Sequence, residues 1–321
     1  MQKKEALSHS SALGANMLWG LMSPISKLVL MGSVIGPMVL TSVRMIGAML
    51  LFWLLSLFIK SSRVERKDHI KLLGAALLGL VINQTCFITG VNYTSPANAS
   101  ILATSMPLWA MLLSAFVLKD PLTLRKITGL ILGSAGSIML ILSSSYKGSD
   151  TSGIIGDILV VTAQISYASY VVFYTHFIHK YPLLTIMKWM FTYASLIILP
   201  LSFFDIIKTD FAALSTLNIM GIAYIVVMST FLSQLLILIA QKNLSPTITG
   251  MYNYIQPVIA SVAAIALGLD VFNTIKLISV IMVFTGVFIV TSSKNTVVIH
   301  RLKENDKDEI SDENKTEAAG K

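Results

Sequence analysis

Long apolar runs separated by short polar connections dominate the chain. A helix that crosses a lipid bilayer needs about 20 mostly apolar residues. This criterion selects segments 11–31, 37–59, 70–91, 96–118, 124–143, 153–175, 183–204, 214–238, 246–268 and 272–292. Because most connections between them are short, successive helices are expected to be antiparallel neighbours. The pattern predicts an all-α integral membrane protein of about ten transmembrane helices.

One apolar stretch occurs twice. Residues 95–120 align without a gap on residues 245–270, and the numbers of every matched pair differ by 150. The matched pairs include Ser95 with Ser245, Pro96 with Pro246, Pro107 with Pro257, Asp120 with Asp270 and, further on, Gly136 with Gly286. We therefore predict a first five-helix repeat over 11–143 and a second over 153–292. The remaining parts are an N-terminal segment (1–10), an external linker (144–152) and a disordered polar tail (293–321).

The parity of each repeat has a mechanical consequence. Each repeat has an odd number of helices, five, so the second repeat enters the membrane from the side opposite to the first. Inverted repeats around a central cavity are the plan on which many secondary transporters expose one site to either side of the membrane. The alternative is a duplication without mechanistic content.

Composition and charge agree with a membrane protein. The mean hydropathy is +0.75, and 55% of residues are hydrophobic against 12% charged. A net charge of +8 would suit nucleic acid, but the Lys and Arg residues lie in patches between apolar runs, as the positive-inside rule requires. The single Cys86 and the scattered His residues exclude a disulfide framework and predict neither a metal site nor a cofactor.

The distribution of Lys and Arg predicts the orientation. With both termini in the cytoplasm, the external loops hold only Lys147, Lys208 and Lys276, and most other cations fall inside. This assignment follows the positive-inside rule. We expect a multi-pass protein of the cell membrane, in contact with lipid and not with nucleic acid.

Several residues in the first repeat resemble a known family. They are Asn16, Trp19-Gly20, Lys27, Pro37, Arg44, Thr94-Ser95, Pro107, Asp120, Gly129 and Gly136. In kind and order they resemble the EamA-type branch of the drug/metabolite transporter superfamily. The resemblance implies a ten-helix carrier with inverted halves that moves small metabolites, often outward. Two departures are Asp where the family usually has Glu, and the lack in the second repeat of a basic residue matching Arg44, the nearest being Lys188.

Two prolines lie about a dozen residues into their segments. Pro107 and Pro257 each remove a helical hydrogen bond and bend the helix. In a bilayer the freed carbonyl needs a partner in the protein or in cavity water. The symmetric pair predicts two hinges beside a cavity, and a packing kink is the alternative.

The ninth segment has a polar centre formed by Thr249, Tyr252, Asn253 and Gln256. On a helix these residues share one face. Because amides facing lipid are costly, this face should line a substrate cavity or contact another helix. The repeat-related positions are apolar, so such a cavity would suit an amphipathic molecule.

Other helices add polar or aromatic groups to the predicted cavity. The candidate substrate-binding residues outside the ninth segment are Trp19, Asn83, Gln84, Gln164, Tyr167 and Gln234. A cavity that orients a small molecule needs a few such groups among apolar ones. Taken singly, each is also compatible with a structural role.

Two cations lie within predicted spans and are candidate charge anchors. Lys27 is near the outer end of its segment and can extend to the interface. Arg44 lies about 10 Å deep at 1.5 Å per residue, and no carboxylate lies at that depth in any span. Asp157 is the nearest candidate partner by depth. Arg44 therefore either attracts an anionic group of the substrate, such as a carboxylate, or bonds backbone carbonyls.

These features predict a secondary transporter and not an enzyme. It would move a small organic metabolite, amino acid-like or amphipathic, by alternating access, in export or exchange. A proton or a counter-substrate would be the coupling partner, and the protein would be a monomer or homodimer. The alternatives are a receptor or assembly subunit without transport, and a membrane enzyme acting on lipid, for which no nucleophile–base pair or carboxylate pair is evident.

Overall fold

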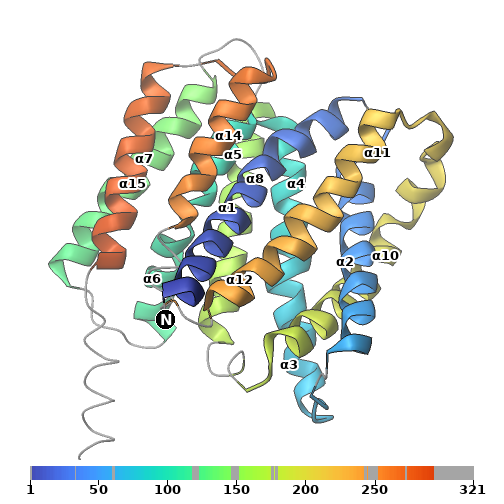
Figure 1. Cartoon of the computed structure of the whole chain (residues 1–321). Helices are drawn as coiled ribbons and strands as arrows, with labels where there is room; N and C mark the ends of the chain where they lie inside the picture. The colour runs from blue at the N-terminus through green and yellow to red at the C-terminus, as the bar shows by residue number, and fades with distance from the viewer. Residues whose placement is uncertain are drawn as a thin grey trace, which may run out of the picture.

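A computed structural model of the chain describes residues 2–32, 34–59, 62–117, 123–145, 152–174, 177, 180–241, 244, 252–271 and 273–292. These residues form helices joined by short connections, and none of them forms a strand. The helices make a single bundle in which α1 (Gln2–Met31) crosses its neighbours obliquely (Figure 1). Each predicted apolar segment contains a helix.

The helices of the first half begin with α1 and follow the predicted order. They are α2 (Pro37–Phe58); α3 (Asp68–Ala76), which continues through the π-helical η1 (Leu77–Ile82) into α4 (Asn83–Tyr93); α5 (Pro96–Ala103) with α6 (Met106–Val117); and α7 (Leu124–Ser145). Those of the second half are α8 (Ser152–Phe173); α10 (Leu183–Lys208); the 3-10 turn η2 (Phe211–Ala213); α11 (Thr216–Ala223), which continues through the π-helical η3 (Tyr224–Leu232) into α12 (Ser233–Gln241); the 3-10 turn η4 (Tyr252–Tyr254) with α14 (Ile255–Ala266); and α15 (Thr274–Ser292).

Among the described residues, six helical segments are long and apolar enough to cross a membrane. They are Pro37–Phe58, Asp68–Tyr93, Pro96–Val117, Gly153–Phe173, Leu183–Lys208 and Thr216–Ile237, and the shorter apolar helices Ile255–Ala266 and Thr274–Ile289 accompany them. Large apolar side chains on the bundle surface, such as Phe58 at 80% and Phe204 at 72% exposure, need lipid around them. The chain is a multi-pass membrane protein.

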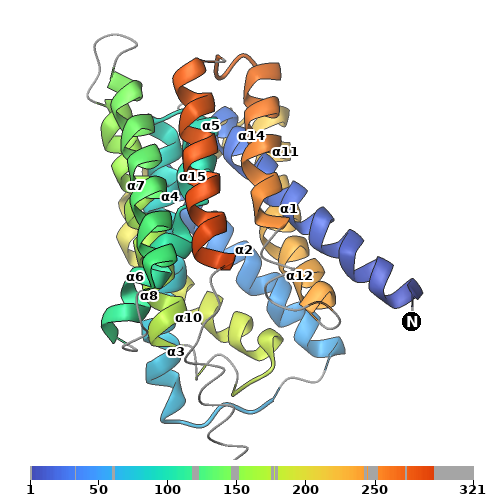
Figure 2. The same ribbon diagram turned by 90° about the vertical axis from the view of Figure 1, so that its left-hand side faces the viewer.

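Each half packs its first helix into the other half. Helix α1 contacts η3, α12 and α14, and the corresponding helix α8 contacts η1, α4 and α6. Two further pairs join equivalent helices: α2 packs on α10, and α7 packs on α15 (Figure 2). Both the exchange and the pairing are what two inverted halves related by a pseudo-two-fold axis produce.

Glycines bring the backbones of α7 and α15 into contact. A Cβ atom on Gly286 would lie 2.5 Å from the Gly133 nitrogen and 2.6 Å from the Gly129 oxygen. A Cβ atom on Gly136 would lie 2.8 Å from the Met282 Cβ. Small residues that allow close backbone approach are typical of helix contacts in membranes.

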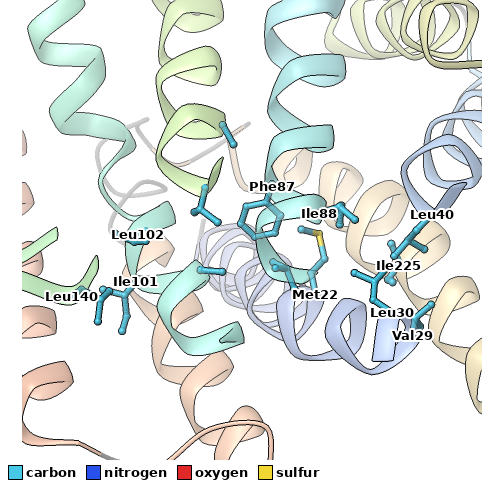
Figure 3. Close-up of a cluster of buried hydrophobic side chains, with 14 of the residues drawn as sticks. Met22, Val29, Leu30, Leu40, Phe87, Ile88, Ile101, Leu102, Leu140 and Ile225 are labelled. Carbon is cyan, nitrogen blue, oxygen red and sulfur yellow. The ribbon is translucent and has the colours of Figure 1, made fainter. Parts of the chain in front are cut away.

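The main buried apolar cluster draws on both halves. Met22, Leu40, Phe87, Ile88 and Leu102 come from the first half, and Ile225 comes from the second (Figure 3). All of these side chains are less than 10% exposed. The halves therefore share one core.

The two π-helical segments lie at equivalent places in the two halves. With the offset of 150 residues, Leu77–Ile82 corresponds to 227–232, which lies within η3 (Tyr224–Leu232). A π-helical turn carries an extra residue and leaves carbonyl groups in need of partners. Ser166 Oγ donates to the Leu78 carbonyl (2.7 Å), and Thr230 Oγ1 donates to the Ile225 carbonyl (2.7 Å). No feature of the sequence predicted these segments.

Candidate functional site

Arg44 is held between α4 of the first half and the π-helical segment η3 of the second. Its Nε donates to Thr230 Oγ1 (2.6 Å), and its Nη1 donates to Gln84 Oε1. Gln84 follows η1 in the first half, whereas Thr230 belongs to η3 in the second. The side chain of Arg44 thus joins the two halves, and it is only 4% exposed.

No carboxylate of the described residues forms an ion pair with Arg44. Asp157, the partner suggested by depth, is fully buried elsewhere and accepts a hydrogen bond from Thr94 Oγ1 (2.5 Å). Within the described region Arg44 does not bond the backbone carbonyls suggested as alternative partners either, because both of its acceptors there are side chains. Arg44 is therefore a buried cation with neutral partners.

A close helix contact brings Thr230 to Arg44. Gly47 lies one turn after Arg44 on α2, and a Cβ atom there would lie 2.5 Å from Val226 Cγ1. Only a residue without a side chain allows η3 to approach α2 so closely. The glycine therefore sets the distance that the Arg44–Thr230 hydrogen bond requires.

The predicted polar residues of the ninth segment meet α1. Gln256 Nε2 donates to Asn16 Oδ1 (2.7 Å) and lies 3.5 Å from Asn253 Oδ1, and the Tyr252 hydroxyl is 2.8 Å from His9 Nδ1. Thr249 lies outside the described residues.

Tyr252, Asn253 and Gln256 do not share the one face of a continuous α-helix that the sequence had predicted. Tyr252 and Asn253 belong to the 3-10 turn η4, and α14 begins only at Ile255. A 3-10 turn has three residues per turn, so its side chains leave the stripe that an α-helix would give. The contacts with α1 show that Gln256 and Tyr252 serve as links between helices. Whether they also bind substrate stays a prediction.

Two further candidates have structural partners. Asn83 is buried and donates to the Ala163 carbonyl on α8 (2.8 Å). Lys27 Nζ donates to the carbonyls of Asn92 (2.6 Å) and Thr94 (3.0 Å) at the end of α4. A cation at the C-terminal end of a helix stabilises its unpaired carbonyls and its dipole. The ammonium group of Lys27 is therefore bound by backbone carbonyls of the protein. The sequence had instead suggested that it extends to the membrane interface.

The remaining candidates lie on three helices. Gln164 on α8 is buried, and Tyr167, one turn further, is 37% exposed with its ring 5.6 Å from that of Tyr170. Trp19 on α1 and Gln234 on α12 are half-buried, and these two helices pack together. Their predicted role in binding substrate stays a prediction.

Both repeat-related prolines follow a break in a helix. Helix α5 ends at Ala103, the amides of Thr104 and Ser105 bond back three residues to Ile101 and Leu102, and Pro107 is the second residue of α6. Pro257 is the third residue of α14, directly after the turn η4. The interruptions thus lie at equivalent places. Their action as hinges stays a prediction.

Comparison with known proteins accounts for the repeated architecture. The EamA-like transporter family matches this chain twice, over residues 7–142 and 154–292, and these two matches cover most of the sequence. The chain belongs to the EamA-like transporter family. Residues of both matched regions contact Arg44, since Gln84 lies in the first and Thr230 in the second.

Several relatives of this EamA-like protein are named as transporters. Two from Bacillus subtilis, the uncharacterized transporters YetK and YyaM, are each 22% identical, over 72% and 75% of this chain and 70% and 79% of their own. The WAT1-related protein At4g15540 of Arabidopsis thaliana is 26% identical over 43% of this chain and 44% of its own. A solved crystal structure with 15% identity and a TM-score of 0.61 covers 89% of this chain and 98% of its own, and shows a similar fold.

The family and its relatives make the chain a membrane transporter. Among the described residues, no group of three or more His, Cys, Asp and Glu side chains is placed to hold a metal ion. Two of the polar contacts that join the halves of this EamA-like transporter are the Arg44–Thr230 hydrogen bond and the Asn16–Gln256 pair.

Proposed function

We propose that this EamA-like transporter is a secondary carrier that moves a small organic metabolite across the cell membrane by alternating access. The family and the inverted, mutually exchanged halves support this function. The observation that carries the mechanism is a polar contact between the halves at one end of the bundle, where α14 turns into α15 (Figure 1).

This contact consists of an ion pair and one longer hydrogen bond. Lys276 Nζ donates to Asp270 Oδ1 within the second half, and it lies 3.4 Å from Ser95 Oγ of the first half. Ser95 is also the N-cap of α5 and accepts from the Asn98 amide (3.2 Å). A single weak bond across the halves can be broken at little cost, as opening of this end requires. We call Ser95, Asp270 and Lys276 the end contact.

The sequence repeats the residues of the end contact. Ser245, Asp120 and Lys126 stand 150 residues from Ser95, Asp270 and Lys276, respectively. Of these three the structure describes Lys126, which is 4% exposed. Equivalent residues assigned to both halves support an exchange between two equivalent states, one open to each side. With both termini cytoplasmic, the end contact faces outward.

Net movement by this carrier is export or exchange. The carboxylates of the described spans lie at their ends, as Asp157 does near the start of α8. A proton carrier is usually a carboxylate buried deep in the membrane, so a counter-substrate is the favoured coupling partner and proton coupling the alternative.

Cross-linking of the end contact tests alternating access. Ser95→Cys and Lys276→Cys are combined with Cys86→Ala, reconstituted into proteoliposomes, and supplied with an aqueous metabolite extract from bacteria. Accumulated compounds are measured by mass spectrometry. A bis-methanethiosulfonate reagent with a short spacer, which replaces the length lost from the Lys276 side chain, should cross-link the double-Cys variant and stop its accumulation, and reduction should restore it. Each single-Cys variant should be insensitive to the reagent.

Two results would contradict the proposal in different ways. Undiminished accumulation by the fully cross-linked protein would refute alternating access at this end. Accumulation no greater than in protein-free liposomes, with or without preloaded extract, would refute the carrier itself and favour a receptor or assembly subunit.

A further inference from the structure

We propose that Arg44, oriented by Gln84 and Thr230, binds a carboxylate group of the carried metabolite. This inference rests on the proposed carrier function and names its substrate class. Four observations support it: the missing counter-charge, the unused donors of the guanidinium group, the fixed orientation of its partners and their distribution over both halves.

The first observation is that no carboxylate among the described residues pairs with Arg44. Arg44 is 96% buried within a helix long enough to span the membrane, and its partners Gln84 and Thr230 are neutral. Buried charges in membrane proteins are normally paired, and an unpaired one marks a ligand or ion pathway. A single positive charge is neutralised by a monoanion such as a carboxylate, whereas a phosphate dianion would leave a net negative charge. The charge balance therefore favours a carboxylate over a phosphate dianion.

The second observation concerns hydrogen-bond donors. A guanidinium group has five N–H donors. Within the described region two of them have acceptors, one on Nε and one on Nη1, and Nη2 has none. Nη2 and the second N–H of Nη1 form the end of the guanidinium group, and such a pair of N–H groups binds both oxygens of a carboxylate at once. The groups that a carboxylate needs are unoccupied.

The third observation is the fixed orientation of the guanidinium group. The Thr230 hydroxyl donates its hydrogen to the Ile225 carbonyl (2.7 Å) and therefore accepts from Arg44 Nε (2.6 Å). The donor and acceptor directions of this chain cannot be reversed, because Arg has no acceptor. Gln84, which belongs to the same half as Arg44, holds Nη1. Gln84 and Thr230 are thus positioning residues that leave the carboxylate-binding end free.

The fourth observation links binding to movement. Gln84 is the second residue of α4, shortly after η1, and Thr230 lies in η3, so the two partners belong to different halves. A carboxylate on Arg44 would change the electrostatic strength of both hydrogen bonds together. Substrate binding at this point therefore acts on both halves, which a carrier requires if the bound substrate is to favour the exchange of states.

The test compares variants in the proteoliposome assay with bacterial metabolite extract. The variants are Arg44→Gln, Arg44→Lys, Thr230→Val and, as the matched control that keeps the hydroxyl, Thr230→Ser. Compounds enriched by the unaltered protein over empty liposomes should carry a carboxylate. Arg44→Gln should reduce their accumulation at least about tenfold, the effect of losing one charge-assisted bidentate contact. Arg44→Lys should reduce it less, Thr230→Val about threefold to tenfold, and Thr230→Ser hardly at all.

A second measurement separates binding from folding. The thermal unfolding midpoint of the unaltered protein should rise with an enriched carboxylate compound and not with its carboxamide, and Arg44→Gln should lose this response. Without ligand, Arg44→Gln should unfold at the same or a higher temperature, because an unpaired buried charge has been removed. A purely structural Arg44 predicts a lower temperature.

Three outcomes overturn the inference. Enrichment of compounds that lack a carboxylate refutes the substrate class while leaving the carrier intact. Equal accumulation of carboxylates by a folded Arg44→Gln variant refutes the site. If the unaltered protein enriches nothing, the carrier proposal fails and this inference fails with it.

Discussion

The side-chain amide of Gln256 donates a 2.7 Å hydrogen bond to the side-chain oxygen of Asn16. This bond connects α14 of the second half with α1 of the first, where α1 is packed against its partner half. The position was predicted to line a cavity or to contact another helix. The observed hydrogen bond is a contact between two helices. The loss of stability on removing it therefore measures how strongly the halves are joined at this place.

Gln256→Ala is expected to lower the free energy of unfolding by about 1 kcal/mol, the usual net value of one hydrogen bond. A double-mutant cycle with Asn16→Ala should give a coupling energy near 0.6 kcal/mol, typical for polar contacts in a membrane protein. Equilibrium unfolding in detergent measures both. A variant of unchanged stability that no longer accumulates any compound would instead identify Gln256 as a substrate ligand.

Gly47→Ala is expected to push η3 away from α2 and weaken the Arg44–Thr230 hydrogen bond. The new Cβ would lie 2.5 Å from Val226 Cγ1, and such overpacking costs about 1–3 kcal/mol. Val226→Ala removes the opposing atom. The double variant should therefore recover most of the lost stability and of the metabolite accumulation. If Val226→Ala does not rescue the variant, Gly47 is required for its backbone conformation and not for the space beside it.

Gly286→Ala should be destabilising without a simple rescue. Here the new Cβ would meet the backbone of Gly133 and Gly129, at 2.5 and 2.6 Å. Because backbone atoms cannot be trimmed, α7 and α15 must separate, and a loss of about 1–3 kcal/mol is expected. Gly268→Ala is not a suitable control because its φ is +69°, and Gly36, which has open space around it, is the better one. A Gly286→Ala protein as stable as Gly36→Ala would contradict the close contact.

The connection before α3 should give the stability a defined pH dependence. Lys180 Nζ lies 2.7 Å from Glu65 Oε1 and 2.6 Å from Asp68 Oδ2. Hydrogen bonds from Lys180, then from Lys67, lower the pKa of Glu65 below its usual value. Hydrogen bonds to Asp68, then to Glu65, raise the pKa of Lys180 above its usual value.

The two shifts act at opposite ends of the pH scale. The contribution of Glu65 is complete above about pH 4.3 and is lost as the pH falls through its lowered pKa. That of Lys180 is complete below about pH 10.4 and is lost as the pH rises through its raised pKa. Lys180→Met should lower the unfolding midpoint at neutral pH by about 2–4 °C and weaken its fall in acid. Lys208→Met, which alters an exposed lysine, serves as the control. Equal effects of both variants would show that the cluster adds no stability.

The sequence was sufficient to locate the helices and to mark two prolines beside which helices are interrupted, but not to predict the 3-10 turn or the π-helical segments. Apolar length located each helical segment, and the aligned prolines located the interruptions before Pro107 and Pro257. These features depend on local properties: the cost of exposing apolar or polar groups in a bilayer, and the amide that proline lacks.

The contacts of the site could be predicted only in part. The sequence placed Arg44 deep within a predicted span, and this position marked it as unusual. A charge at that depth is expected to be buried in the protein and not to face lipid. Its pairing with Thr230 depends on the approach of η3 to α2 over Gly47, and on a π-helical turn that has no signature in the residues. Lys27 is a similar case, since its partners are carbonyls at the end of another helix. Long-range contacts of this kind are fixed by packing and not by local pattern.

The exchange of α1 and α8 between the halves has a consequence for biosynthesis. Helix α8 fills the surface of η1, α4 and α6, and it is made only after the whole first half has been synthesised. A nascent chain that stops before α8 leaves Asn83 without the Ala163 carbonyl and Leu78 without the Ser166 hydroxyl. The first five helices are therefore an unfinished intermediate that quality-control proteases should recognise, and supplying residues 152–321 as a separate polypeptide should protect it.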